Sequence, residues 1–381
     1  MLAEAIKQCG VKYCFGVVGV PVIEVGVALQ AAGLIYIGMR NEQAASYAAG
    51  AVGYLTGTPG VCLCVSGPGV VHALAGLANS KENGWPMILI GGASDSSLDS
   101  MMSFQESPQV EFARPYVKYA ARFDSLERIP FYVERAFRTS MAGRPGPVYL
   151  DLPGDLVNKS PNEAKVVWPV SRGPAVASIA DPIEIEKACQ ALVNAKSPLV
   201  IVGKGMQIAR AEKEVLALLN ETGYPFIPSP MGKGLVPDSH SQNVIAARST
   251  ALEKADVVIL LGSRLNWINH FGLPPRFSAK VKIIQVDILP EAFGDNVPNA
   301  ANLMGHGPLV VDQLRKALIK HKGYKALTGD EEWWKTLAAK VEKNTNAAAE
   351  LAADASVPMN YYHPITLIQD LLVKDYPDSF M

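Results

Sequence analysis

The sequence predicts an α/β protein made of two doubly wound parallel-sheet domains, followed by the start of a third, truncated α/β domain. Short apolar runs alternate with helical stretches through residues 1–155, which is the pattern of βα units and a parallel sheet. Periodicity is lost in the Pro- and Gly-rich linker 156–180, and the alternation resumes in 181–325. Residues 326–381 are expected to form a linker helix and the beginning of the third domain.

The first domain is expected to contain five strands, because five short runs are rich in apolar and β-branched residues. These runs are Tyr13–Val18, Leu34–Met39, Val61–Val65, Met87–Ile90 and Val148–Leu150. The helices expected between them are Val22–Ala32, Glu42–Leu55 and Val70–Lys81. The second of these strands is apolar throughout and the helix from Glu42 is rich in Ala and Gly, so both are expected to be buried.

Three strands are expected in the second domain, and each is followed by a polar pattern. The strands are Leu199–Val202, Val257–Leu261 and Val281–Val286. They are followed, in order, by Gly203-Lys204-Gly205, Gly262-Ser263-Arg264 and Asp287. Because the carboxyl ends of parallel strands share one edge of a sheet, these polar residues are expected to lie together.

The charged, Ala-rich stretch Asp330–Asp354 is expected to form an exposed helix. Trp333 and Trp334 are expected to pack this helix against the body of the protein. A helix over Pro364–Val373 follows, and Tyr376–Met381 is expected to be a turn that enters a new strand.

Composition excludes several classes of protein. Of the 381 residues, 49% are apolar and 19% are charged, which supplies a large core and excludes disorder. The net charge of −1, without blocks of like charge, argues against a nucleic-acid or membrane-surface protein. No apolar run reaches the length of a spanning helix. The five cysteines lack zinc-ligand spacing and are expected to be reduced core thiols of an intracellular protein.

Glu42 is the leading candidate for chemistry, because it lies where a strand ends and a helix begins. Asn41 is expected to cap the helix, which places Glu42 in its first turn. A carboxyl group held between apolar elements favours its protonated form and becomes available as a proton donor. The alternative is that Glu42 only complements the helix dipole.

Two glycine turns follow strands of the first domain, Gly19-Val20-Pro21 and Ser66-Gly67-Pro68-Gly69. Because glycine has no Cβ, such a turn lets the backbone approach a flat ring closely, although an ordinary strand-to-helix turn has the same composition. Val20 is expected to form an apolar wall for a substrate. His72, one turn into the next helix, is expected to be a structural hydrogen-bonding residue.

Lys204, Arg264 and Asp287 together suggest a nucleotide site in the second domain. Two cations suit phosphate groups, and an aspartate at a strand end suits ribose hydroxyls. Arg144 is expected to join them from the first domain. Each residue also has a structural explanation, as a surface lysine, an ion pair or a helix cap.

Motifs along most of the chain resemble those of thiamine-diphosphate enzymes. The order and spacing of the pyrimidine-binding domain are matched by Phe15–Pro21, Arg40–Ala44, Val65–Gly69 and Phe104–Glu106. The resemblance continues through Gly143–Pro147, Ile201–Gly205, Gly262–Trp267 and Pro358–Tyr362. Within the family the sequence is most similar to the 2-hydroxyacyl-CoA lyases, with the oxalyl-CoA decarboxylases next. The two domains are thereby identified as pyrimidine-binding and central nucleotide-binding-like.

The resemblance assigns roles in the first domain. Glu42 is implied to be the acid that activates the cofactor, and the cofactor-binding residues are Gly19, Val20, Pro21, Glu42, Ser66, Gly67, Pro68 and Gly69. Phe104 and Gln105 are implied to reach the reacting carbon. The decarboxylases have a tyrosine near the position of Phe104, so its missing hydroxyl favours a lyase. Gln105 can donate to a developing oxyanion without being charged.

In the second domain, the resemblance implies that ADP is held by Lys204, Arg264 and Asp287, with Arg144 beside them. Arg248 and Asn360 match positions that contact the phosphates of CoA in the relatives. Without the resemblance, Arg248 would be expected to be solvated.

The implied reaction is that of a carbon–carbon lyase of fatty acid α-oxidation, which converts a 2-hydroxyacyl-CoA to formyl-CoA and an aldehyde one carbon shorter. The alternatives are an oxalyl-CoA decarboxylase and a non-catalytic nucleotide-binding fragment. The resemblance also implies thiamine diphosphate, Mg²⁺ and ADP as ligands, an acyl-CoA substrate, and a homodimer or homotetramer when complete. A peroxisomal location is implied and a cytoplasmic one is the alternative, since no targeting signal is recognisable in the chain.

The family binds Mg²⁺ and the diphosphate through a Gly-Asp-Gly type of motif and a downstream Asn, and this pair is not found in the sequence. No metal ligand is therefore assigned in this chain, and the Mg²⁺ ligands are expected in a missing C-terminal domain. The chain is expected to be an incomplete copy that has no lyase activity alone.

Overall fold

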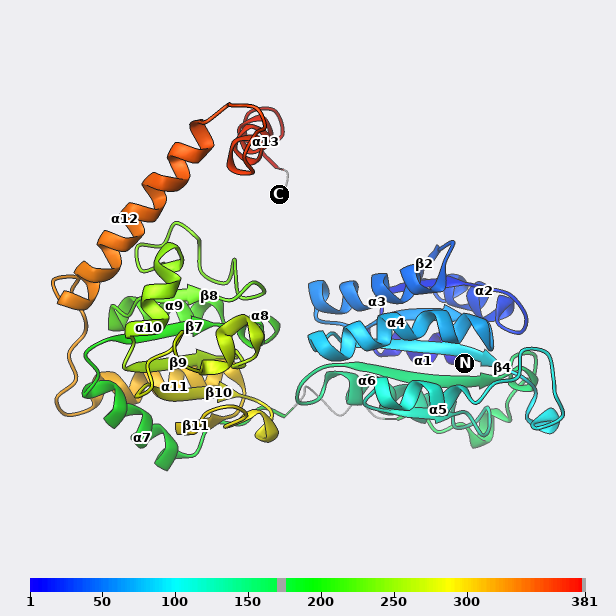
Figure 1. Ribbon diagram of the computed structural model, residues 1–381. Helices are drawn as coiled ribbons and strands as arrows, with labels where there is room; N and C mark the ends of the chain where they lie inside the picture. Colours follow the sequence, from blue (N-terminus) through cyan, green and yellow to red (C-terminus); the bar gives the residue numbers. More distant parts are fainter. Residues whose placement is uncertain (170–175, 379–381) are drawn as a thin grey trace. The chain divides into compact units, whose positions relative to one another are not determined.

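The computed structural model describes residues 1–169 and 176–378, which divide into two compact units, Met1–Val176 and Ala177–Met381 (Figure 1). Each unit contains one sheet in which every strand pairing is parallel. The predicted fold class of two doubly wound parallel-sheet domains is therefore confirmed. The predicted linker includes residues 170–175, which lie outside the described residues.

Unit 1 has a six-stranded sheet in the order β2-β1-β3-β4-β6-β5. Its strands are β1 Tyr13–Val17, β2 Ile35–Gly38, β3 Gly60–Cys64, β4 Met87–Ala93, β5 Ala120–Arg122 and β6 Pro147–Pro153. Its helices are α1 Leu2–Gln8, α2 Ile23–Ala31, α3 Glu42–Thr56, α4 Pro68–Asn83, α5 Gln109–Ala113 and α6 Ile129–Met141. Side chains of α1, α2 and α6 bury one face of the sheet, and side chains of α3 and α4 bury the other. Cys62 and Cys64 share the latter face, because alternate residues of a strand point to the same side of a sheet.

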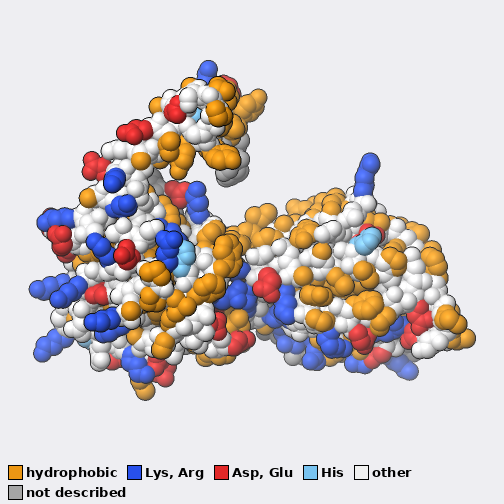
Figure 2. Space-filling model, viewed as in Figure 1, with side chains coloured by type: hydrophobic (Ala, Val, Ile, Leu, Met, Phe, Trp, Pro, Cys, Tyr) orange, Lys and Arg blue, Asp and Glu red, His pale blue; other side chains and the backbone are white. Residues whose placement is uncertain are grey.

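The prediction that the second strand and the following helix are buried is wrong in part. Ile35 and Ile37 of β2 are 52% and 38% exposed, because β2 is an edge strand and α3 packs on β1 and β3 instead. Helix α3 buries one face, including Ala45 and Ala49, and exposes Leu55 on the other. Figure 2 shows hydrophobic side chains on the face of unit 1 formed by α3 and α4.

Unit 2 has a five-stranded sheet in the order β11-β10-β9-β7-β8. Its strands are β7 Pro198–Val202, β8 Phe226–Pro228, β9 Val257–Leu261, β10 Lys282–Asp287 and β11 Asn299–Met304. Its helices beside this sheet are α7 Pro182–Val193, α8 Lys204–Ile208, α9 Glu212–Thr222, α10 Arg248–Lys254 and α11 Gly307–Lys320. The sequence analysis missed β5, β8 and β11. The first two have only three residues each, and β11 lacks a continuous apolar run, so none carries a periodic signal.

The helix predicted after residue 330 is confirmed as α12 Glu332–Ala353, and α13 Tyr362–Asp375 follows it. Trp333 is buried and its Nε1 donates to the Pro198 carbonyl at 2.9 Å, while Trp334 Nε1 donates to the Gly223 carbonyl at 3.1 Å. Both tryptophans therefore attach α12 to the rest of unit 2, as predicted. The strand expected near the end of the chain would include residues 379–381, which are outside the described part.

None of the helices within residues 1–169 and 176–378 is both long enough and apolar enough to cross a bilayer.

Candidate functional site

The candidate site of unit 1 lies at the carboxyl end of its sheet, where the loops after β1, β3 and β4 meet. Strand β1 lies between β2 and β3, so the chain turns to opposite sides of the sheet after β1 and after β3. Such a reversal leaves a crevice at the ends of the two strands. The two glycine turns meet there, since a Cβ built on Gly19 would lie 2.9 Å from Val65 Cγ1.

Glu42 enters this crevice from the first turn of α3. The Asn41 side chain accepts a hydrogen bond from the Ala44 amide at 3.1 Å, which confirms the predicted cap. The Glu42 side chain is 14% exposed, so it is partly buried, and its Oε2 lies 3.2 Å from His72 Nδ1. A Cβ built on Gly69 would lie 3.7 Å from Glu42 Oε1, so the glycine leaves the carboxyl group approachable from that side.

His72, which the sequence analysis left out of the site, is a direct neighbour of Glu42. It belongs to α4 and contacts the Glu42 carboxyl group, although its own side chain is 59% exposed. Gly69 and His72 are three residues apart in α4, and residues at that spacing lie on the same face of a helix. This spacing was the available signal, because Gly69 had already been placed in the site.

Gly67 makes a close approach to another loop of unit 1. It adopts a left-handed φ of 55°, and a Cβ built on it would lie 2.7 Å from the Gln105 carbonyl oxygen. The backbone of Gly67 therefore makes room for the loop that carries Gln105. In the same contact, Ser66 Oγ donates to Gln105 Oε1 at 3.3 Å.

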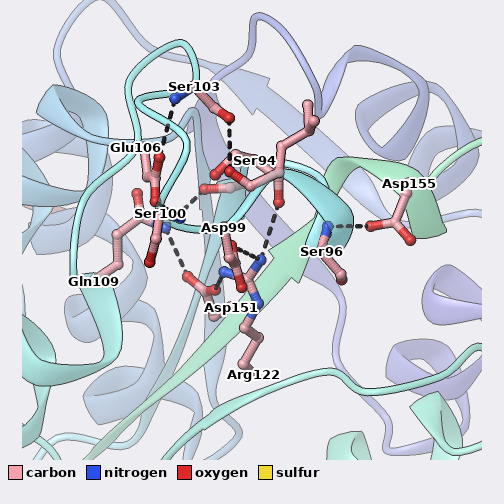
Figure 3. Close-up of polar contacts among 12 residues, drawn as sticks. Ser94, Ser96, Asp99, Ser100, Ser103, Glu106, Gln109, Arg122, Asp151 and Asp155 are labelled. Atoms are coloured by element: carbon pink, nitrogen blue, oxygen red, sulfur yellow. Dashed lines mark hydrogen bonds and ion pairs between the residues drawn. The ribbon is translucent and has the colours of Figure 1, made fainter.

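The loop between β4 and α5 brings Gln105 to the Ser66 turn and leaves Phe104 at the surface, 74% exposed. Glu106 holds this loop by accepting hydrogen bonds from the amides of Ser100 and Ser103 (Figure 3). These backbone hydrogen bonds lower the pKa of Glu106 below its ordinary value of 4.5. Glu42, Gln105 and the two glycine turns are thus assembled at one edge of unit 1.

The predicted nucleotide residues of unit 2 also lie at one sheet edge. Strands β7, β9 and β10 are neighbours in the sheet, and Lys204, Arg264 and Asp287 stand at their carboxyl ends. The first two turns touch, because the Gly205 amide donates to the Gly262 carbonyl at 3.0 Å. The Asp287 carboxyl group accepts from the Leu289 amide at 3.0 Å.

The three other residues predicted to contact ADP or CoA form hydrogen bonds with nearby parts of their own unit. Arg144 belongs to unit 1, where its guanidinium donates to the Glu82 carbonyl at 2.6 Å. Arg248 is partly buried rather than solvated, and it bonds to the Ile268 carbonyl and, at 3.1 Å, to His270 Nε2. The Asn360 side chain donates to the Leu351 carbonyl at 2.8 Å and accepts from the Tyr362 amide at 2.8 Å, so it joins α12 to α13.

Among the described residues, no group of three His, Cys, Asp or Glu side chains is arranged to hold a metal ion.

Comparison of the sequence with known proteins identifies the family of this chain. The profile described as "Thiamine pyrophosphate enzyme, N-terminal TPP binding domain" matches residues 1–112, and "Thiamine pyrophosphate enzyme, central domain" matches residues 185–314. Together the two matches cover more than half of the chain, which belongs to the thiamine pyrophosphate enzyme family.

Individual relatives include two acyl-CoA enzymes. The chain is 48% identical to 2-hydroxyacyl-CoA lyase 1 of Mus musculus over 377 residues, which are 98% of this chain and 64% of that protein. The human 2-hydroxyacyl-CoA lyase 1 is also 48% identical, over 98% of this chain and 64% of its own length. Oxalyl-CoA decarboxylase of Escherichia coli (strain K12) is 35% identical over 98% of this chain and 66% of its own length. The chain thus spans less than two thirds of the mouse and human relatives.

Proposed function

We propose that this chain contributes the pyrimidine-binding and central domains of a thiamine-diphosphate-dependent lyase that cleaves a 2-hydroxyacyl-CoA to formyl-CoA and an aldehyde one carbon shorter. The observation that carries the proposal is the partly buried Glu42 carboxyl group, which faces Gly69 at the crevice between β1 and β3. The 48% identity to the mouse and human lyases, against 35% to the Escherichia coli decarboxylase, supports the choice of reaction.

The residues of the crevice fit the pyrimidine ring of the cofactor. A side chain at Gly69 would collide with Val65 and cover the Glu42 carboxyl group, so glycine leaves a flat surface there. Glu42 is proposed to hold a proton at a ring nitrogen, with His72 orienting its carboxyl group. Val20, which is exposed in this structure, is proposed to line the substrate side. When bound, thiamine diphosphate supplies the electron sink for cleavage of the carbon–carbon bond.

Gln105 is proposed to stabilise negative charge on the substrate. Ser66 donates to its amide oxygen, and in this orientation the amide nitrogen is the atom that donates to an oxyanion. Phe104 beside it presents an apolar ring without a hydroxyl group. An oxalyl-CoA decarboxylase remains the alternative function, supported by the 35% identity to that enzyme.

The test of the function is product analysis with the complete protein, thiamine diphosphate and Mg²⁺. With a 2-hydroxyacyl-CoA as substrate, we expect formyl-CoA and the shortened aldehyde in equal amounts. Preferential turnover of oxalyl-CoA, with release of CO₂, would assign the decarboxylase instead. Mg²⁺ as the second cofactor, assembly as a homodimer or homotetramer, and a peroxisomal location are further proposals that rest on the family resemblance.

We also propose that Lys204, Arg264 and Asp287 bind ADP in unit 2. The support is their position at the ends of three neighbouring strands, at the reversal of strand order between β7 and β9. Replacing Arg264 with Ala removes a charge-assisted hydrogen bond to a phosphate, worth about 1.5–3 kcal/mol, so ADP affinity should fall roughly 10- to 100-fold in calorimetry. Lys213→Ala, on the exposed side of α9, is the control and should bind ADP normally. Equal affinity in both variants would exclude Arg264 from the nucleotide site.

A further inference from the structure

A buried polar network lies beneath the candidate site of unit 1 (Figure 3). Its centre is formed by Asp151 of β6 and Gln109, the first residue of α5, which are 1% and 3% exposed. The network also contains Tyr149 of β6 and Arg122 of β5. Burying such groups is costly unless their hydrogen bonds are made, so a network of this kind specifies one arrangement of the segments that it joins.

Gln109 connects this network to the Ser66–Gly69 turn. Its Oε1 accepts from the Gly67 amide at 2.5 Å. On the other side of the same amide group, Nε2 donates towards Asp151 Oδ1 at 2.6 Å and the Gly92 carbonyl at 2.9 Å. Tyr149 donates to the same Asp151 oxygen at 2.5 Å. A single buried side chain therefore links the Gly67 backbone to the Asp151 carboxyl group.

Arg122 connects the same carboxyl group to the loop between β4 and α5. Its Nη1 donates to Asp151 Oδ2 at 2.9 Å, and its Nη2 donates to the Ser94 carbonyl at 3.0 Å and to Asp99 Oδ1 at 2.9 Å. Ser94 and Asp99 belong to the loop that carries Gln105. The two oxygens of Asp151 thus hold the two segments that meet at Gly67 and Gln105.

The loop depends on such support, because it is strained and weakly packed. Ser100, Met102 and Gln105 have left-handed φ values of 67°, 59° and 54°, a conformation that is unfavourable for residues other than glycine. A cavity of about 930 Å³ lies against the loop, and Gln105, Gln109, Arg122 and Asp151 are among the residues that line it. An apolar core does not fill this space, so polar contacts decide where the loop lies.

The position of Asp151 is itself maintained by its donors. Burial raises the pKa of Asp151 above its ordinary value of 3.8, while hydrogen bonds from Tyr149, Gln109 and Arg122 act in the opposite direction. A carboxylate that is costly to bury stays in place only if the donors converge on it. Loss of one donor is therefore expected to disturb the others.

We propose that Gln109 and Asp151 are positioning residues of the candidate site. Gln109 holds the Ser66–Gly69 turn, and Asp151, through Arg122, holds the Ser94–Pro108 loop, so that Gln105 meets Ser66 in one geometry. The arrangement of turn and loop stands on these contacts alone, and its consequence for catalysis rests on the proposed function.

The test is site-resolved amide hydrogen exchange on this chain. Gln109→Met removes the hydrogen bonds but keeps the length of the side chain. We expect exchange at Gly67 and across Ser94–Pro108 to become at least about tenfold faster, while the buried β3 amides change much less. Val133→Ala is the control, because Val133 is a fully buried residue of α6 in the core on the opposite face of the sheet from Tyr149. In this control we expect no selective change at the turn and loop.

Arg122→Lys tests the connection from Asp151 to the loop separately from the connection to Gly67. It also avoids leaving the buried Asp151 carboxylate without a cation. It keeps a cation for Asp151 but loses the planar fork that reaches Asp99 and Ser94, so exchange should increase in the loop and not at Gly67. Uniform acceleration in Gln109→Met that matches Val133→Ala would overturn the proposal, as would an unchanged loop in Arg122→Lys. In the complete enzyme, Gln109→Met is expected to lower kcat at least about tenfold with a smaller change in KM. If the complete protein lacks lyase activity, the exchange results still decide the positioning role.

Discussion

Glu42→Gln is expected to slow the exchange of the thiazolium C2 proton on bound thiamine diphosphate by about 10²- to 10⁴-fold, the usual contribution of a positioned acid or base. The substitution keeps the size and the hydrogen-bonding shape of the side chain but removes its exchangeable acidic proton. The structure places the carboxyl group in the first turn of α3, partly buried and 3.2 Å from His72 Nδ1. The measurement is deuterium incorporation at C2 in the complete protein, followed by NMR after rapid acid quench.

Glu24→Gln is the matched control for this experiment. Glu24 also lies in the first turn of a helix of unit 1, α2, and complements the dipole of that helix. If Glu42 had only this electrostatic role, both variants would show the same C2 exchange as the unsubstituted protein. That outcome would remove Glu42 from the catalytic site, whereas a selective loss in Glu42→Gln supports it.

Trp333→Ala is expected to lower the free energy of unfolding of unit 2 by about 3–5 kcal/mol, as large-to-small changes of buried aromatic residues do. The indole is 5% exposed, packs in the core with Leu337, and donates to the Pro198 carbonyl at 2.9 Å. Its loss leaves a cavity and an unpaired carbonyl at the start of β7. Chemical denaturation measures the change, and amide exchange in the first half of α12 shows whether the helix detaches.

Trp267→Ala controls for the removal of a tryptophan as such. Trp267 belongs to the same unit but is 73% exposed, so its replacement should change stability by less than about 0.5 kcal/mol. Equal destabilisation by the two substitutions would contradict the packing of α12 on β7.

The sequence by itself determined the type of fold and the position of the candidate residues at strand ends. The alternation of apolar runs and helices is visible in the local sequence and predicts parallel βα units, and both sheets are built from such units. The Asn41 cap and the polar residues after β7, β9 and β10 are likewise local features, because capping and strand ends depend on a few adjacent residues. The packing role of Trp333 and Trp334 was also predictable, because two large aromatic rings at the start of a polar helix are usually buried against another surface.

Only the tertiary structure decided which of these residues meet, and which faces are covered. Ile35 and Ile37 have the composition of a buried strand, yet β2 is at the edge of the sheet and α3 packs elsewhere. His72 meets Glu42 across 30 residues of chain, and Gln109 meets Asp151 across 42. Such contacts depend on strand order and helix placement, which arise from packing over the whole unit. Local periodicity records the conformation of a segment, and it carries no information about which distant segment will lie against it.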